Sequence, residues 1–137
     1  MSQRTLVLLK PDAVRRGLAG EIISRIERKA GWRFAAVELR TFDRATLEQH
    51  YAEHVGRPFY EPLLEFMTSG PSLALIVEGE EVVKGIRMLA GATNPLEAGA
   101  GTIRGDFATI TRENLIHASD SPESAEREIK IFFPAHA

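Results

Sequence analysis

Short apolar runs alternate with amphipathic segments along most of the chain, and this alternation constrains the fold more than any other feature. Residues 4–9 and 72–78 are predicted to form buried strands. Residues 32–42 partly alternate apolar and polar side chains, which predicts a half-solvated strand, and residues 114–119 form a fourth candidate. A proline follows Lys10 and cannot continue a central ladder, so a lysine lies at the end of the first strand.

Between these runs, apolar residues recur at steps of three and four, which is the spacing of amphipathic helices. Helices are expected at residues 20–30, 46–54, 59–67, 82–89 and 121–133. This order predicts an α/β (α+β) fold of ferredoxin-like type, with a four-stranded antiparallel sheet and helices packed on one of its faces. Residues 1–137 have the size of one domain and contain no linker or repeat, so a single domain is expected.

The charge balance and the absence of cysteine exclude several classes of protein. Seventeen Lys and Arg residues against nineteen Asp and Glu give a net charge of −2, which does not indicate a dedicated nucleic-acid surface. Without cysteine there is no disulfide framework and no thiol nucleophile. The longest apolar runs are far shorter than a membrane span or a signal-peptide core, so a soluble cytoplasmic protein without membrane contact is expected.

The segment from Asn114 to Ser121 contains the strongest local candidate for chemistry. His117 lies among small and polar residues just before a predicted helix, and a neutral imidazole is a competent nucleophile. Glu128 lies at the margin of that helix's apolar stripe. If it accepted a proton from one ring nitrogen of His117, it would fix the tautomer and leave the other nitrogen free to attack. Spacing alone gives equal weight to a structural histidine.

Three cations complete the case for an anionic substrate. Lys10 ends a strand, Arg87 lies on the helix before a long glycine-rich loop, and Arg104 lies within that loop. Together with a nucleophilic histidine they indicate phosphoryl transfer, where positioning and charge neutralisation supply most of the catalysis. Loss of either arginine is expected to slow the reaction without affecting stability. Arg25 and Arg28, on the polar face of the first long helix, are expected to be solvated and dispensable.

Three other patterns point to different functions. Residues 99–104 approach a dinucleotide-binding fingerprint, but no strand precedes them. Residues 50–54 (HYAEH) match a zinc-hydrolase motif, although exposed helical histidines are the commoner explanation for His50 and His54. An RNA-binding module on the same kind of sheet would need strand aromatics in an RNP pattern, which no segment contains. A protein that retains little metal on purification would disfavour the zinc hydrolase.

Longer motifs resemble those of the nucleoside diphosphate kinases across essentially the whole chain. The family's run N-x-x-H-[GA]-S-D-[SG] is present as residues 114–121. Other matching stretches are RTLVLLKPDAVRRGL at 4–18, HYAEH at 50–54, PFYEPLLEFMTSGP at 58–71 and GTIRGDFA at 101–108.

The resemblance implies a ping-pong exchange, in which a nucleoside triphosphate phosphorylates the histidine and a nucleoside diphosphate then takes the phosphoryl group, with broad base specificity. His117 resembles the nucleophile, Glu128 the carboxylate that orients it and Lys10 a catalytic cation. Mg²⁺ is expected to be held through the nucleotide phosphates without a direct protein cage. A homo-oligomer is implied, a hexamer in preference to a tetramer, with residues 92–112 as the subunit-contact loop. The residues that match the family's nucleotide contacts are Lys10, Tyr51, Phe59, Leu63, Arg87, Thr93, Arg104 and Asn114.

The same resemblance revises one expectation drawn from periodicity. Phe59 and Leu63 lie on one face of a predicted helix and would be assigned to the core, but the resemblance places them against the nucleotide base. The chain departs from the family pattern at Ala13, Ala100 and Thr111, where glycine, proline and valine are frequent. None of these three positions carries the implied chemistry.

Overall fold

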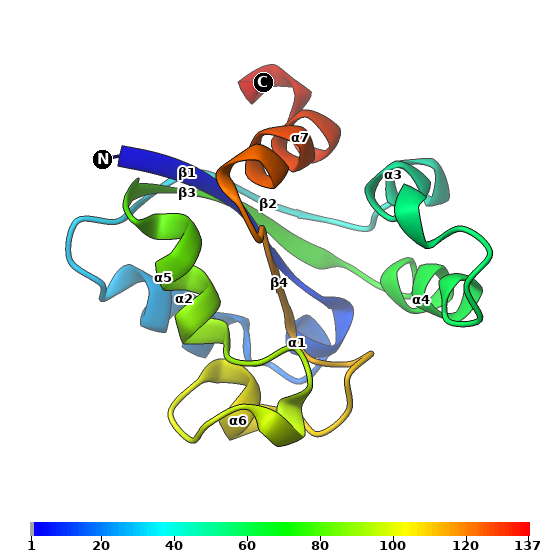
Figure 1. The fold of residues 1–137 in the computed structure, drawn as a ribbon, viewed down its shortest axis with the longest axis horizontal. Helices are drawn as coiled ribbons and strands as arrows, with labels where there is room; N and C mark the ends of the chain where they lie inside the picture. Colours follow the sequence, from blue (N-terminus) through cyan, green and yellow to red (C-terminus); the bar gives the residue numbers. More distant parts are fainter. Residues whose placement is uncertain (1) are drawn as a thin grey trace.

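A computed structural model describes residues 2–137, and its centre is a four-stranded sheet. The strands are β1 (Ser2–Leu9), β2 (Arg33–Arg40), β3 (Ser72–Glu80) and β4 (Ile116–Ala118). Their order is β2-β3-β1-β4, and every neighbouring pair is antiparallel (Figure 1). The predicted ferredoxin-like antiparallel sheet is therefore confirmed.

Seven helices in the described residues connect and cover the strands. The last helix begins as the sequence indicates: Ser121 caps it by accepting a hydrogen bond from Ser124 N–H, and Pro122 occupies its first turn. The helices are α1 (Pro11–Arg15), α2 (Ala19–Glu27), α3 (Arg44–His50), α4 (Tyr60–Met67), α5 (Val82–Ala90), α6 (Ile103–Phe107) and α7 (Pro122–Phe132).

Helices cover both faces of the sheet, so the expectation that they lie on one face is wrong. In β1, Leu6 and Leu8 pack with residues of α3, α4 and α7, whereas Val7 and Leu9 pack with residues of α2 and α5. Figure 1 shows α7 on one side of the sheet and α2 with α5 on the other. The unbroken apolar run of β1 is consistent with helices on both faces, because successive strand residues point to opposite faces of the sheet. All four residues at 6–9 are fully buried.

Strand β2 lies at one edge of the sheet and is half-solvated, as predicted. Its outer positions include two apolar side chains, Val37 and Leu39, which are 52% and 61% exposed. An edge strand with exposed apolar side chains is a surface on which another chain can pair.

Several boundaries differ from the prediction. The helix expected at 20–30 ends at Glu27, so Ala30 is exposed, and the five-residue helix α1 was not predicted. The long segment 91–113 contains α6 and a 3₁₀ turn, Pro95–Glu97, and strand β4 is limited to three residues. Within residues 2–137, no helix has both the length and the apolar character needed to cross a membrane.

Candidate active site

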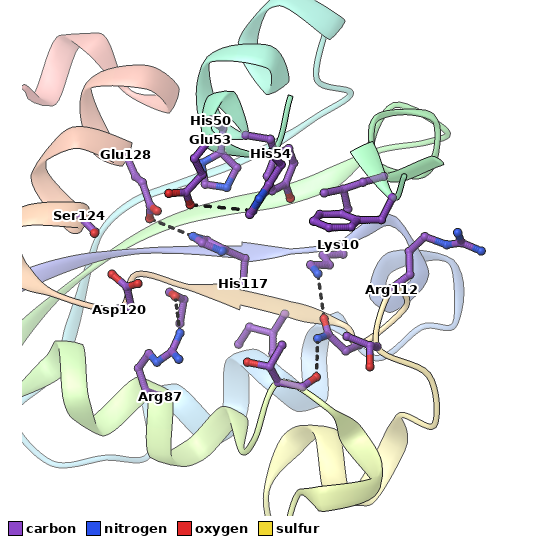
Figure 2. Close-up of a pocket in the computed structure, with 18 of the residues that line it drawn as sticks. Lys10, His50, Glu53, His54, Arg87, Arg112, His117, Asp120, Ser124 and Glu128 are labelled. Carbon is purple, nitrogen blue, oxygen red and sulfur yellow. Dashed lines mark hydrogen bonds and ion pairs between the residues drawn. The ribbon is translucent and has the colours of Figure 1, made fainter. Parts of the chain in front are cut away.

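Strand β4 places His117 beside the two elements that complete its surroundings. His117 is paired with Leu8 of β1 in the antiparallel register, and residues directly opposite each other point to the same face of a sheet. Leu8 packs on the face covered by α3 and α7. His117 therefore projects toward these helices, which bring His50 and Glu128 to it (Figure 2).

Glu128 receives a hydrogen bond from His117, as the spacing suggested. Glu128 Oε1 lies 2.9 Å from His117 Nε2, and the carboxylate is buried. Burial opposes its ionisation, but hydrogen bonds from His117 and Ser119 and the nearby imidazole charges together lower its pKa to about 2. An ionised carboxylate only accepts hydrogen bonds, so Nε2 must donate, which leaves the lone pair of a neutral imidazole on Nδ1.

Ser119 is a third member of this group, and sequence reasoning did not single it out. Its hydroxyl donates to Glu128 Oε1 over 2.7 Å and accepts from the Leu6 N–H at 3.2 Å. The serine thus ties the carboxylate to the backbone of the central strand β1. The motif around His117 contains this serine, so the residue was visible in the sequence although its role was not.

A tight backbone connection places Lys10 and Asn114 next to each other. Leu115 adopts a left-handed conformation with φ of 75°, and its peptide is held from both sides: Lys10 N–H donates to Leu115 O, and Leu115 N–H donates to the buried Asp12 carboxylate. Lys10 Nζ then donates to Asn114 Oδ1 over 2.8 Å, and the Asn114 amide donates to Thr93 O. The lysine is fixed before any ligand arrives.

Lys10 is a buried cation without an ion pair among the described residues. Burial, with a further contribution from the charge of Arg104, lowers its pKa from 10.5 to about 8, and Asp12 offsets this only in part. A buried lysine with a lowered pKa is suited to bind an anionic ligand, because the negative charge of the ligand would favour the protonated form of Lys10.

Arg104 is buried and is anchored by the protein itself. Three of its N–H groups donate to the main-chain carbonyls of Gly91, Asn114 and Ile116. A guanidinium has five donors, so two remain for a ligand. Burial and the nearby charge of Arg87 lower its pKa to about 10. These three hydrogen bonds predict that removal of Arg104 lowers the stability of the protein, contrary to the expectation from the sequence.

Arg87 differs from Arg104 in its surroundings. It is exposed on α5 and donates one hydrogen bond, to Ala118 O at 3.1 Å, so most of its donors are available. Figure 2 shows its guanidinium directed toward the same pocket as His117.

Arg25, expected to be solvated, is engaged in several contacts. It bonds Glu21 on its own helix, pairs with Asp106 over 2.9 Å and lies over the Phe107 ring. These contacts join α2 to α6. Within residues 2–137, Arg28 is exposed and donates only to Ser24 O of the preceding turn, so of the two arginines it alone is solvated as expected.

His50 is not the exposed helical histidine that its motif suggested. It is buried at the end of α3, and its ring packs edge-on against the His117 ring with centroids 4.8 Å apart. Burial and the neighbouring His117 lower its pKa to about 3, so the ring is neutral. The zinc-hydrolase pairing with His54 does not form, because the cluster of possible metal ligands contains His117 and Glu128 instead.

One pocket of about 890 Å³ collects all the residues predicted for the site. Phe59, 46% exposed, and Leu63 line this pocket, as the resemblance implied, although Leu63 also packs partly against the core. Tyr51 is buried in its wall, where burial and the Glu128 charge raise the pKa of its hydroxyl. The predicted site residues that line this pocket are Lys10, Tyr51, Phe59, Leu63, Arg87, Thr93, Arg104, Asn114, His117 and Glu128.

The arrangement combines a buried carboxylate, an oriented imidazole and three cations in one cavity. The sequence profile of the nucleoside diphosphate kinase family matches residues 3–137. The chain belongs to this family of enzymes. It is 74% identical over 134 residues to the nucleoside diphosphate kinase of Streptomyces griseus subsp. griseus and 75% identical to that of Streptomyces avermitilis, with 98% of both chains covered in each comparison.

The fold agrees with solved structures of the nucleoside diphosphate kinase family. A halophilic member from Halobacterium salinarum, in complex with CDP, superposes with a TM-score of 0.93 at 41% identity, covering 97% of this chain and 88% of that one. A member from Encephalitozoon cuniculi superposes with a TM-score of 0.92 at 43% identity, covering 96% and 88%.

Proposed function

We propose that this chain transfers the γ-phosphoryl group of a nucleoside triphosphate to a nucleoside diphosphate in two steps through His117. Nδ1 attacks the γ-phosphorus, the N–P bond forms, and the bond to the bridging oxygen breaks to release the diphosphate. The second diphosphate then attacks the phosphohistidine and restores the imidazole. The hydrogen bond from His117 Nε2 to the ionised Glu128 is the single observation that carries this proposal, because it leaves Nδ1 nucleophilic.

The cations support the same proposal. In phosphoryl transfer, charge develops on the oxygens of the moving group, and fixed donors stabilise it more than mobile ones. Lys10 and Arg104 are held in place by hydrogen bonds to other parts of the chain, and Arg87 has most of its donors free. We assign these three side chains to the phosphates and Tyr51, Thr93 and Asn114 to further contacts with the sugar and phosphates.

Mg²⁺ is proposed to enter with the nucleotide. Mg²⁺ prefers oxygen ligands in octahedral geometry, but the one cluster of three potential metal ligands in residues 2–137 offers two imidazoles. The residues thus fit an ion bound to phosphate oxygens and water, where it neutralises phosphate charge, with the chain's cations binding the remaining oxygens.

Incubation with γ-labelled ATP tests the proposal directly. We expect label on the protein that is lost in acid and retained in base, as a phosphohistidine requires, and its transfer to added diphosphate. Label that survives acid would place the phosphate on a hydroxyl and contradict the assignment.

Weak base selectivity is expected from the apolar residues that line the pocket. Phe59 and Leu63 offer aromatic and aliphatic faces and no hydrogen-bonding groups, and every base has a face to stack. Values of kcat/KM for purine and pyrimidine diphosphates should differ by less than about a thousandfold, because larger discrimination requires a polar reader. A preference above this limit would contradict the assignment of these two residues.

Binding of a diphosphate near pH 8.5 should take up a proton at Lys10. Without ligand, Lys10 loses its proton above a pH of about 8, whereas the negative phosphates of a bound diphosphate favour the protonated lysine. The affinity for the diphosphate therefore falls as the pH rises above about 8. The lowered pKa of Lys10 also affects folding in the absence of ligand. Between pH values of about 8 and 10.5 this lysine is protonated in the unfolded chain and neutral in the folded one, so the free energy of unfolding rises with pH. Calorimetry of ADP binding in two buffers of different ionisation enthalpy measures the uptake. Equal proton uptake on ADP binding by the wild type and Lys10→Met would contradict the assignment of this proton to Lys10.

We also propose self-association and a cytoplasmic location. The exposed apolar side chains of the edge strand β2 support pairing with a second copy of the chain. A hexamer is preferred to a tetramer, and a molar mass of one chain by light scattering would contradict both.

A further inference from the structure

His50 has no role in the phosphoryl transfer described above, yet it lies buried beside the nucleophile. Neither of its ring nitrogens has a hydrogen-bond partner among the described residues. A buried polar side chain without a partner requires an explanation, because leaving it unpaired costs stability. In Figure 2 the rings of His50 and His117 and the carboxylate of Glu128 lie close together.

We propose that His50, His117 and Glu128 form an inhibitory site for a divalent transition-metal ion such as Zn²⁺. The three ligand atoms lie within 4.8 Å of one another. Two imidazoles and a carboxylate are a ligand set that Zn²⁺ takes in proteins, with a fourth position left for water. The side chain of His117 is 21% exposed to the pocket, which provides the ion's entry route.

Only a modest adjustment is needed for coordination. Tetrahedral Zn²⁺ with bonds of about 2 Å requires ligand atoms about 3.3 Å apart. His117 Nε2 and Glu128 Oε1 are already 2.9 Å apart, so the movement falls mainly on the His50 ring. The unpaired nitrogens of that ring lose no hydrogen bond when it moves.

Coordination of His117 blocks its attack on phosphorus through either ring nitrogen. If the ion binds Nδ1, it occupies the lone pair that would attack. If it binds Nε2, the proton from Nε2 moves to Nδ1, because a neutral imidazole carries one N–H, and the pocket-facing lone pair is lost. The inhibition rests on the proposed function, but binding of the ion does not.

Zinc binding is measured first without nucleotide, so that the ion cannot bind phosphates. Calorimetry of the wild-type protein should give one Zn²⁺ per chain, and His50→Gln should weaken binding at least tenfold. His54→Gln is the matched control, since His54 lines the same pocket outside the cluster, and its affinity should stay within twofold. Equal affinities of wild type and His50→Gln would overturn the proposal.

A second measurement needs no variant and remains valid if His50→Gln does not fold. Zn²⁺ should shift the imidazole ¹⁵N resonances of His50 and His117 in the wild type and leave those of His54 and His136 in place. Shifts confined to His54 or His136 would overturn the site.

With Mg²⁺ in excess, added Zn²⁺ should slow the phosphorylation of His117 by labelled ATP, and a chelator should restore the rate. The same degree of inhibition should require at least tenfold more Zn²⁺ in His50→Gln. An unchanged rate of phosphorylation with Zn²⁺ bound would overturn the proposed inhibition but not the proposed binding site. A chain that binds Zn²⁺ but never forms phosphohistidine contradicts the proposed function instead.

Discussion

Replacement of His117 by alanine should abolish labelling of the protein by γ-labelled ATP and reduce nucleotide phosphorylation to background. The ionised, buried Glu128 accepts a hydrogen bond from one ring nitrogen of His117 and leaves the other nitrogen with a free lone pair. No other side chain that lines the pocket has a nucleophilic atom prepared in this way. His117 lies on a short strand at the sheet edge and its ring is partly exposed, so truncation should leave the fold intact. Label incorporation and a thermal unfolding curve, measured on the same preparation, check both parts.

Imidazole in solution provides the positive control for this variant. It should restore part of the activity by occupying the space that the side chain leaves, with the phosphoryl group passing through the added imidazole. Phosphotransfer that persists in His117→Ala without added imidazole would contradict the assignment of the nucleophile.

The second large effect separates the two arginines. Removal of one preorganised donor in an active site costs about 10²- to 10³-fold in rate, so Arg87→Ala and Arg104→Ala should each slow phosphorylation of His117 by at least about tenfold. Only Arg104→Ala should also destabilise the protein, since it removes three hydrogen bonds to main-chain carbonyls. We expect a loss of about 3 kcal/mol in the free energy of unfolding, or about 10 °C in Tm.

Arg28→Ala is the matched control for both arginines, because Arg28 is exposed and bonds only its own helix. Its rate and its Tm should equal those of the wild type. Equal small losses of rate at all three positions would show that diffuse charge, and not placed donors, supports the reaction.

The strand and helix segments and the candidate pair of His117 and Glu128 could be recognised in the sequence because both follow from local patterns. The alternation of apolar runs and amphipathic segments specifies which residues form strands and helices. Glu128 lies on the helix that follows the short strand of His117, so the two are brought together by one connection. Such short-range relations are readable without knowledge of the sheet order.

Relations that depend on the packing of distant elements could not be predicted. The sequence predicts an exposed position for His50 because nothing in its own helix shows that α3 lies against β4 and α7. Arg104 looked like a free loop charge because its partners are backbone carbonyls, which have no sequence signature. Asp12 and Ser119 were missed because their contacts are to the backbone or another element.

Phe59 and Leu63 illustrate a different limit. Helical periodicity groups them on one face but does not state whether that face meets the core or a cavity, and the resemblance to known enzymes decided between the two. Both residues line the pocket, and Leu63 also packs partly against the core.

The most direct test of the central claim, that the phosphoryl group rests on the enzyme between two half-reactions, is a set of initial velocities. The diphosphate concentration is varied at several fixed concentrations of ATP, below the range in which either nucleotide inhibits. Double-reciprocal lines should be parallel, because the first product leaves before the second substrate binds. Lines that intersect would require both nucleotides on the enzyme at once and would contradict the phosphohistidine route through His117.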